Sequence, residues 1–74
     1  MSALDELARK LRERTDHPRR GGKVVELHLF AIEHANALEN VSLPALLQRA
    51  GMHESYKTEL RKGMNLAPFV RVNG

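Results

Sequence analysis

The sequence contains no cysteine, which excludes a disulfide framework and a zinc site built on thiolates. It also contains no tryptophan, and its aromatic content of 4% is too low for a platform on which single-stranded nucleic acid could stack. No apolar run approaches the roughly 20 residues that a membrane-spanning helix needs. The opening residues, MSALDELARKLRER, alternate acidic and basic side chains and lack the apolar core of a signal peptide. We therefore expect a soluble cytoplasmic protein without a membrane partner.

Motifs that carry chemistry are also scarce. The pair Gly21-Gly22 alone is too short to form a loop that cradles phosphate. Four histidines are present, but His28 and His34 are six residues apart and so point to different faces of a helix, and no H-E-x-x-H motif occurs. A hydrolase requires a nucleophile, an oriented base and a concave pocket, for which a few short helices leave little room. We expect no enzyme activity, no metal and no cofactor.

The length and the net charge of the chain limit the folds and partners that are still possible. The 74 residues form one domain at most, and a domain this small buries only roughly 60% of the surface of its unfolded chain. The net charge of +3 is divided unevenly, with +2 in residues 1–20, −2 in residues 21–40 and +3 in residues 41–74. Positive charge near both ends permits an anionic partner such as nucleic acid, although many proteins with this balance bind nothing anionic.

A first helix is predicted from about Ala3 to Arg14. Ser2 followed by Asp5 gives a start that resembles a capping box. An apolar stripe at helical spacing consists of Leu4, Leu7, Ala8 and Leu11. This stripe can pack on the protein's own core, or it can form the seam of a homodimer.

A basic loop follows in residues 15–23. Pro18 disfavours helix in the residue before it, and two glycines add flexibility. The loop carries three positive charges, on Arg19, Arg20 and Lys23. It can act as an arm that contacts the phosphate backbone of nucleic acid, or it can be a solvated linker.

The apolar pattern of residues 23–39 predicts one central and deeply buried helix. One of its faces carries Val25, Leu29, Ile32 and Asn36. This face is widened by Val24, Leu27, Ala31, Ala35 and Leu38. The first residues are rich in β-branched side chains, which also suit a strand, but the length of the pattern favours helix.

Two short helices and a tail complete the predicted fold. Ser42 is a good N-cap for a third helix, which ends at Gly51. A fourth helix runs from about Glu54 to Lys62 and stops at Gly63, and the remaining residues, MNLAPFVRVNG, form an extended tail with at most one short strand. The fold class is therefore all-α: a small bundle of about four short helices with an extended C-terminal tail.

The segment SLPALLQRAGMHESYKTELRKG, residues 42–63, resembles the helix-turn-helix of small bacterial and phage repressors. Gly51 matches the turn glycine of that family, Met52 matches the apolar residue after it, and Leu60 matches a buried position of the second helix. The segment departs from the family at Lys57, where a branched apolar residue is usual, because here the apolar residue is Tyr56. The chain is also similar to small bacterial proteins described as helix-turn-helix-like.

The resemblance implies that the second helix of the unit binds double-stranded DNA, in a small regulator of transcription. Anchors at Met52, Tyr56 and Leu60 would leave the opposite face of the fourth helix outward. The predicted DNA-binding residues are Ser55, Lys57, Thr58, Arg61 and Lys62, with Arg19, Arg20 and Lys23 as auxiliary phosphate contacts. Repressors of this kind often bind as two-fold dimers.

The alternative is a protein-interaction module in which the helix-turn-helix serves as a scaffold. The two hypotheses differ in the surface they require. A continuous positive stripe that includes Arg49 and Arg71 would favour DNA, whereas a patch broken by Glu54 and Glu59, or an exposed apolar groove, would favour a protein partner.

Overall fold

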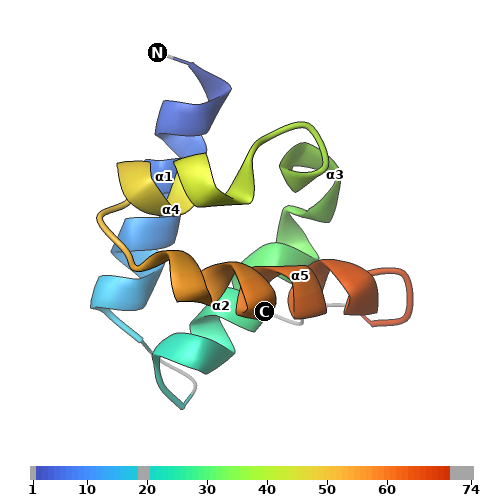
Figure 1. Ribbon diagram of the computed structural model, residues 1–74. Helices are drawn as coiled ribbons and strands as arrows, with labels where there is room; N and C mark the ends of the chain where they lie inside the picture. Colours follow the sequence, from blue (N-terminus) through green and yellow to red (C-terminus); the bar gives the residue numbers. More distant parts are fainter. Residues whose placement is uncertain (1, 19–20, 71–74) are drawn as a thin grey trace.

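The computed structural model describes residues 2–18 and 21–70, and within these ranges all regular structure is helical. The elements are α1 (Ala3–Asp16), α2 (Lys23–Glu33), α3 (Ala35–Leu38), α4 (Leu43–Arg49), a 3₁₀ turn η1 (Glu54–Tyr56) and α5 (Lys57–Leu66). Figure 1 shows α4 lying against α1 and α5 lying across α2. The prediction of an all-α bundle of short helices is confirmed.

Helix α1 begins at the predicted cap and extends two residues beyond the predicted end. The hydroxyl oxygen of Ser2 accepts a hydrogen bond from the backbone N–H of Asp5 at 3.1 Å. The predicted leucine stripe faces the protein's own core, since Leu7 and Leu11 are buried. The alternative that the stripe packs on the protein's own core is confirmed for these two side chains, and the homodimer stays a prediction.

The predicted central helix over residues 23–39 is wrong as one unbroken element. The chain bends at His34, where φ is −115° and ψ is 21°, and α3 continues in a new direction. The backbone loses little at this bend, since the N–H of His34 still bonds the carbonyl of Phe30 at 2.9 Å. The bend turns α3 towards the C-terminal part of α5 and buries Leu38.

The buried face of α2 agrees with the predicted one at Leu27 and Ala31 but differs at Val25. Leu27, Phe30 and Ala31 are buried together with Glu26, while Val25 is exposed. The burial of Glu26 is explained by Arg14 of α1, whose Nε lies 3.2 Å from the carboxylate of Glu26. A buried carboxylate is tolerated where a cation and hydrogen bonds replace its water.

The same guanidinium of Arg14 pairs with Glu33 at the end of α2. It therefore joins α1 to both ends of the buried face of α2. These ion pairs add a polar link between two helices whose buried apolar residues belong to one core.

Helix α4 has the predicted cap at each end. The Ser42 hydroxyl accepts from the N–H of Ala45 at 3.3 Å, and Gly51 follows the helix with φ at 74°. The N–H of Met52 bonds the carbonyl of Leu47 at 2.8 Å, and the N–H of Gly51 bonds that of Gln48 at 3.1 Å. These two bonds form a Schellman motif, which requires the left-handed conformation that glycine adopts most easily. The chain reversal after α4 is thus fixed by its sequence.

The predicted end of the last helix at Gly63 is wrong, and so is the extended conformation predicted for residues 64–69. Helix α5 passes through Gly63 to Leu66, and turns rather than a strand follow in the described part of the tail. A Cβ atom at Gly63 would lie 2.5 Å from the Cβ of Ala31 and 2.7 Å from the carbonyl oxygen of His28. Gly63 is therefore the point at which α5 approaches α2 closely, and the contact between these helices is the most extensive in the fold.

Candidate nucleic-acid interface

Helices α4 and α5 form the predicted helix-turn-helix unit. The reversal at Gly51 is followed by Met52, which packs against the core, and Tyr56 packs there as well. Leu60 is 0% exposed and lies among the buried residues. The three predicted anchors therefore hold α5 against the body of the protein, as the spacing of four residues indicated.

A 3₁₀ turn introduces α5 and delays its start to Lys57. The Nδ1 atom of His53 accepts from the N–H of Ser55 at 3.0 Å and lies 2.9 Å from the Ser55 hydroxyl. His53 thus caps the turn, a role that the sequence reading did not assign. Ser55 is exposed as predicted, but its hydroxyl is already engaged by this ring.

The outward face of α5 is a narrow polar arc. The exposed polar residues of α5 are Thr58, Arg61, Lys62 and Asn65. At about 100° per residue, these four positions fall within an arc of about 100°, on the side of the helix opposite Leu60. We call this set the α5 arc. Asn65 was missed by the sequence reading because the helix was expected to stop at Gly63.

Lys57 lies beside the arc and Lys62 lies at its edge, and each has a carboxylate partner one turn earlier. Lys57 Nζ lies 3.2 Å from Glu54, and Lys62 Nζ lies 3.2 Å from Glu59. Within the described ranges, Arg61 and Asn65 have no ion pair and no side-chain hydrogen bond. Arg61 is therefore the cation of α5 whose donors are free for a ligand.

Glu59 is held towards α2 and away from the arc. Its Oε2 lies 2.6 Å from Nε2 of His28, and its other oxygen accepts from Lys62. The hydrogen bond from His28, followed by that from Lys62, lowers the pKa of Glu59 below its usual value. The carboxylate is therefore ionised and oriented, and it ties α5 to α2 through a polar contact beside the apolar one.

Of the three predicted auxiliary phosphate contacts, the structure describes Lys23 alone. Lys23, in the first turn of α2, lies over the ring of Tyr56 with its Nζ 5.0 Å from the centroid. This contact brings a positive charge to the start of α5, as the proposed auxiliary role requires. Arg19 and Arg20 lie outside the described residues, as does Arg71.

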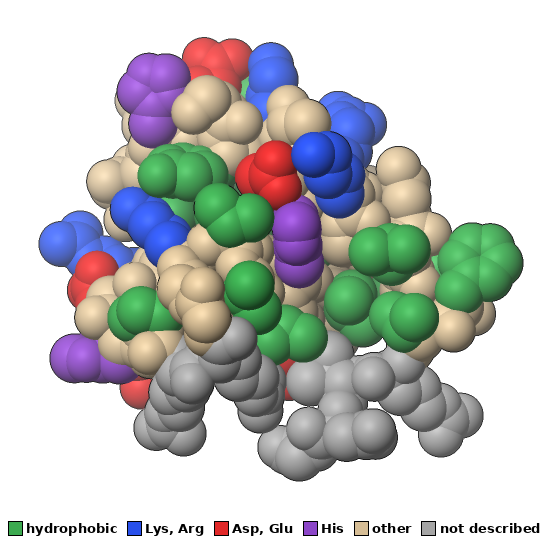
Figure 2. Space-filling view, turned by 90° about the horizontal axis from the view of Figure 1, so that it is seen from below, with side chains coloured by type: hydrophobic (Ala, Val, Ile, Leu, Met, Phe, Trp, Pro, Cys, Tyr) green, Lys and Arg blue, Asp and Glu red, His purple; other side chains and the backbone are tan. Residues whose placement is uncertain are grey.

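A continuous positive stripe is not present on the described surface. Arg49 pairs with Asp5 of α1, and the two lysines of α5 pair with glutamates. In Figure 2, Lys and Arg side chains form separate groups with apolar and acidic side chains between them. The positive charge of this face is therefore local rather than extended.

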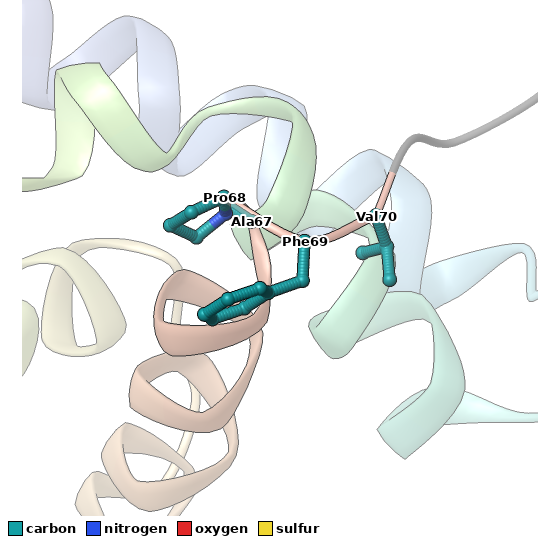
Figure 3. A pocket seen from close by; sticks show the side chains of 4 residues that line it. All are labelled: Ala67, Pro68, Phe69 and Val70. Carbon is teal, nitrogen blue, oxygen red and sulfur yellow. The ribbon is translucent and has the colours of Figure 1, made fainter.

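An exposed apolar end follows the arc. Leu66 is 47% exposed and Phe69 is 82% exposed, and Val70 is also exposed. Figure 3 shows Phe69 beside the last turn of α5 in a shallow hollow lined by Ala67, Pro68, Phe69 and Val70. Four successive residues of one segment line this hollow, so it is a local feature of the surface and not a cleft between elements.

Neither a metal cluster nor a membrane-spanning helix is found in the part of the chain that is described. No three His, Asp or Glu side chains there come together in a way that could hold a metal ion. None of its helices has the length and apolar character to cross a membrane.

Comparisons with known proteins address the family of the chain. Neither the curated proteins nor the solved structures gave a match. A family model described as an HTH-like domain matches residues 3–73, which is nearly the whole chain and includes α4, the turn at Gly51 and α5. The chain therefore belongs to the family of HTH-like domains.

Proposed function

We propose that this HTH-like domain binds double-stranded DNA by placing α5 in the major groove, in a binding rather than a catalytic role. The observation that carries the proposal is the α5 arc, which presents hydrogen-bonding groups and no carboxylate. An α-helix with its side chains is about 10–12 Å across, and the major groove is about 12 Å wide. Helix α5 fits such a groove with its arc towards the base edges.

The lysines that border the arc supply the phosphate contacts. Lys57 and Lys62 are about 140° apart around the helix axis, so they would face the two backbones that flank the groove. Each is now paired with a glutamate, but exposed pairs of this kind contribute only about 0–1 kcal/mol. A phosphate can therefore replace the carboxylate at little cost.

The small number of phosphate contacts determines how strongly the DNA affinity should depend on salt concentration. Each phosphate neutralised contributes about −0.9 to the slope of log affinity against log salt concentration. With Lys57, Lys62 and Lys23 as contacts, the slope would be about −2 to −3. Binding would be measurable at low salt and weak at moderate salt, which suits a small bacterial regulator of transcription that gains affinity by acting in pairs.

The test is a titration of the labelled protein with mixed-sequence duplex DNA at two salt concentrations, followed by NMR. Shifts confined to residues 53–65 that weaken as salt rises support the proposal. Lys57→Glu should abolish them. Lys10→Glu on α1 is the matched control. The side chains of Lys10 and Lys57 are both 45% exposed, and each pairs with a glutamate three or four residues earlier in the chain. Equal losses in both variants would indicate a net-charge effect and would contradict the proposed site.

A protein-contact role is the second candidate, and the exposure of Phe69 favours it. Large exposed apolar side chains often mark contacts with other proteins. If DNA produces no shifts and sedimentation shows self-association that Phe69→Ser abolishes, this second function replaces the first.

A further inference from the structure

Arg61 and Asn65 differ from Ser55, Lys57 and Lys62 of the helix-turn-helix unit. Ser55 is engaged by His53, and Lys57 and Lys62 are engaged by glutamates. Both Arg61 and Asn65 are exposed, and neither has an intramolecular side-chain partner in residues 2–18 and 21–70. Their donors and acceptors can therefore bind a ligand without breaking a hydrogen bond or ion pair within the described part of the protein.

Their placement suits two neighbouring base pairs. Residues four apart on a helix are adjacent on its surface, with Cβ atoms about 5–6 Å apart. Base pairs are stacked about 3.4 Å apart, so the two side chains span one to two base-pair steps. Because Lys57 and Lys62 lie on either side, contacts of the lysines to the two backbones would hold this pair of side chains over the base edges.

The chemistry of the two side chains selects particular bases. The guanidinium fork of arginine fits O6 and N7 of guanine, and the amide of asparagine fits N6 and N7 of adenine. A lysine is a point charge without such a fork. We propose that Arg61 and Asn65 are specificity-determining residues that read a guanine and an adenine at adjacent or next-adjacent base pairs. This inference rests on the proposed DNA-binding function.

The experiment selects duplexes from a pool with a randomised centre, using the full chain at low salt, and then measures affinities by fluorescence anisotropy. The wild-type protein should enrich a guanine and an adenine within two base pairs of each other. Arg61→Lys keeps the charge and should reduce the preference for guanine at its position by about 5- to 150-fold, which corresponds to 1–3 kcal/mol per bidentate contact. Asn65→Ala should relax the preference for adenine only.

Lys62→Ala is the control for phosphate contacts, because it should weaken all sequences alike. Circular dichroism and the thermal midpoint of each variant confirm that it is folded. Equal binding of all duplexes by the wild type, or a preference that survives both Arg61→Lys and Asn65→Ala, overturns the inference and leaves the proposed function intact. A complete absence of duplex binding overturns the proposed function and the inference with it.

Discussion

Gly63 sets the distance between α5 and α2, and an added methyl group tests this role. Alanine normally stabilises a helix by about 1 kcal/mol relative to glycine. Here its Cβ would lie 2.7 Å from a backbone oxygen of α2, and overpacking of this kind costs about 1–3 kcal/mol. The two effects oppose each other, so we expect Gly63→Ala to lower the free energy of unfolding by up to about 2 kcal/mol in urea titrations. Asn65→Ala on the exposed face should change it by less than about 0.5 kcal/mol. A more stable Gly63→Ala variant would refute the close contact.

His34, at the bend between α2 and α3, predicts a pH dependence of stability. Burial lowers the pKa of His34 below 6.5, an effect that Glu33 partly opposes, and the ring packs on Phe30 with centroids 4.5 Å apart. The unfolded chain therefore takes up this proton at a higher pH than the native protein. Stability from this group is complete above pH 6.5 and is lost as pH falls towards the lowered pKa.

The measurement compares thermal midpoints at about pH 7.5 and about pH 5.5, on the two sides of the usual histidine pKa. His34→Phe keeps an aromatic ring against Phe30 and removes the titrating group, so its midpoint should fall less between these values. An unchanged pH dependence in His34→Phe would assign the effect to other groups.

At the scale of elements, the turn between α4 and α5 determines where the α5 arc points. Gly51 has φ at 74°, and an added Cβ would lie 3.1 Å from a guanidinium nitrogen of Arg12. Alanine disfavours this conformation by about 1–2 kcal/mol, whereas asparagine tolerates it. We expect Gly51→Ala to be less stable than the wild type by about this amount, and Gly51→Asn to lose less. Both variants add a Cβ beside Arg12, so a difference between them isolates the backbone effect. Equal losses would instead indicate crowding at Arg12.

The same elements show how far the sequence predicts the fold. Ser42 and Gly51 carry local signals for a cap and a reversal, and the predicted bounds of α4 are accurate because hydrogen bonds between near neighbours decide them. Gly63 carries the same local signal as Gly51 but has the opposite role, because only the approach of Ala31 from another helix explains it. The bend at His34 has neither proline nor glycine, so no local pattern marks it.

The candidate site likewise combines features that the local sequence predicts with features that depend on packing between helices. The spacing of Tyr56 and Leu60 correctly predicts that Thr58, Arg61 and Lys62 face outward, since helical periodicity is a local property. Asn65 is missed because its place in the α5 arc depends on the helix continuing past Gly63. Lys62 and Glu59 are three residues apart on one helix, a spacing that the sequence itself shows. The contact of Glu59 with His28 depends on the packing of α5 against α2 and has no sequence signal of its own.

At the scale of the whole molecule, the packing of the helices would influence DNA recognition more than the charge of the described residues would. The Cα radius of gyration is 11.1 Å, and several cations are matched by carboxylates within the fold, including Arg14, Arg49, Lys57 and Lys62. Among residues 2–18 and 21–70, little charge is left over for long-range attraction of an anionic partner, while Arg19, Arg20 and Arg71 lie outside these ranges. Recognition of DNA by this domain would therefore depend on the shape and hydrogen bonding of α5 more than on electrostatic steering.

The last prediction concerns the stability that holds α5 in place. A domain of 74 residues has a free energy of unfolding of about 4–11 kcal/mol, and Leu→Ala in a core costs about 2–5 kcal/mol. Leu60 is 0% exposed and Leu66, on the same helix, is 47% exposed. We therefore expect Leu60→Ala to lose a large part of the total stability in urea titrations, and Leu66→Ala to lose less than about 1 kcal/mol. Because the chemical change and the helix are the same, the difference measures burial alone, and equal losses would mean that α5 does not dock through Leu60.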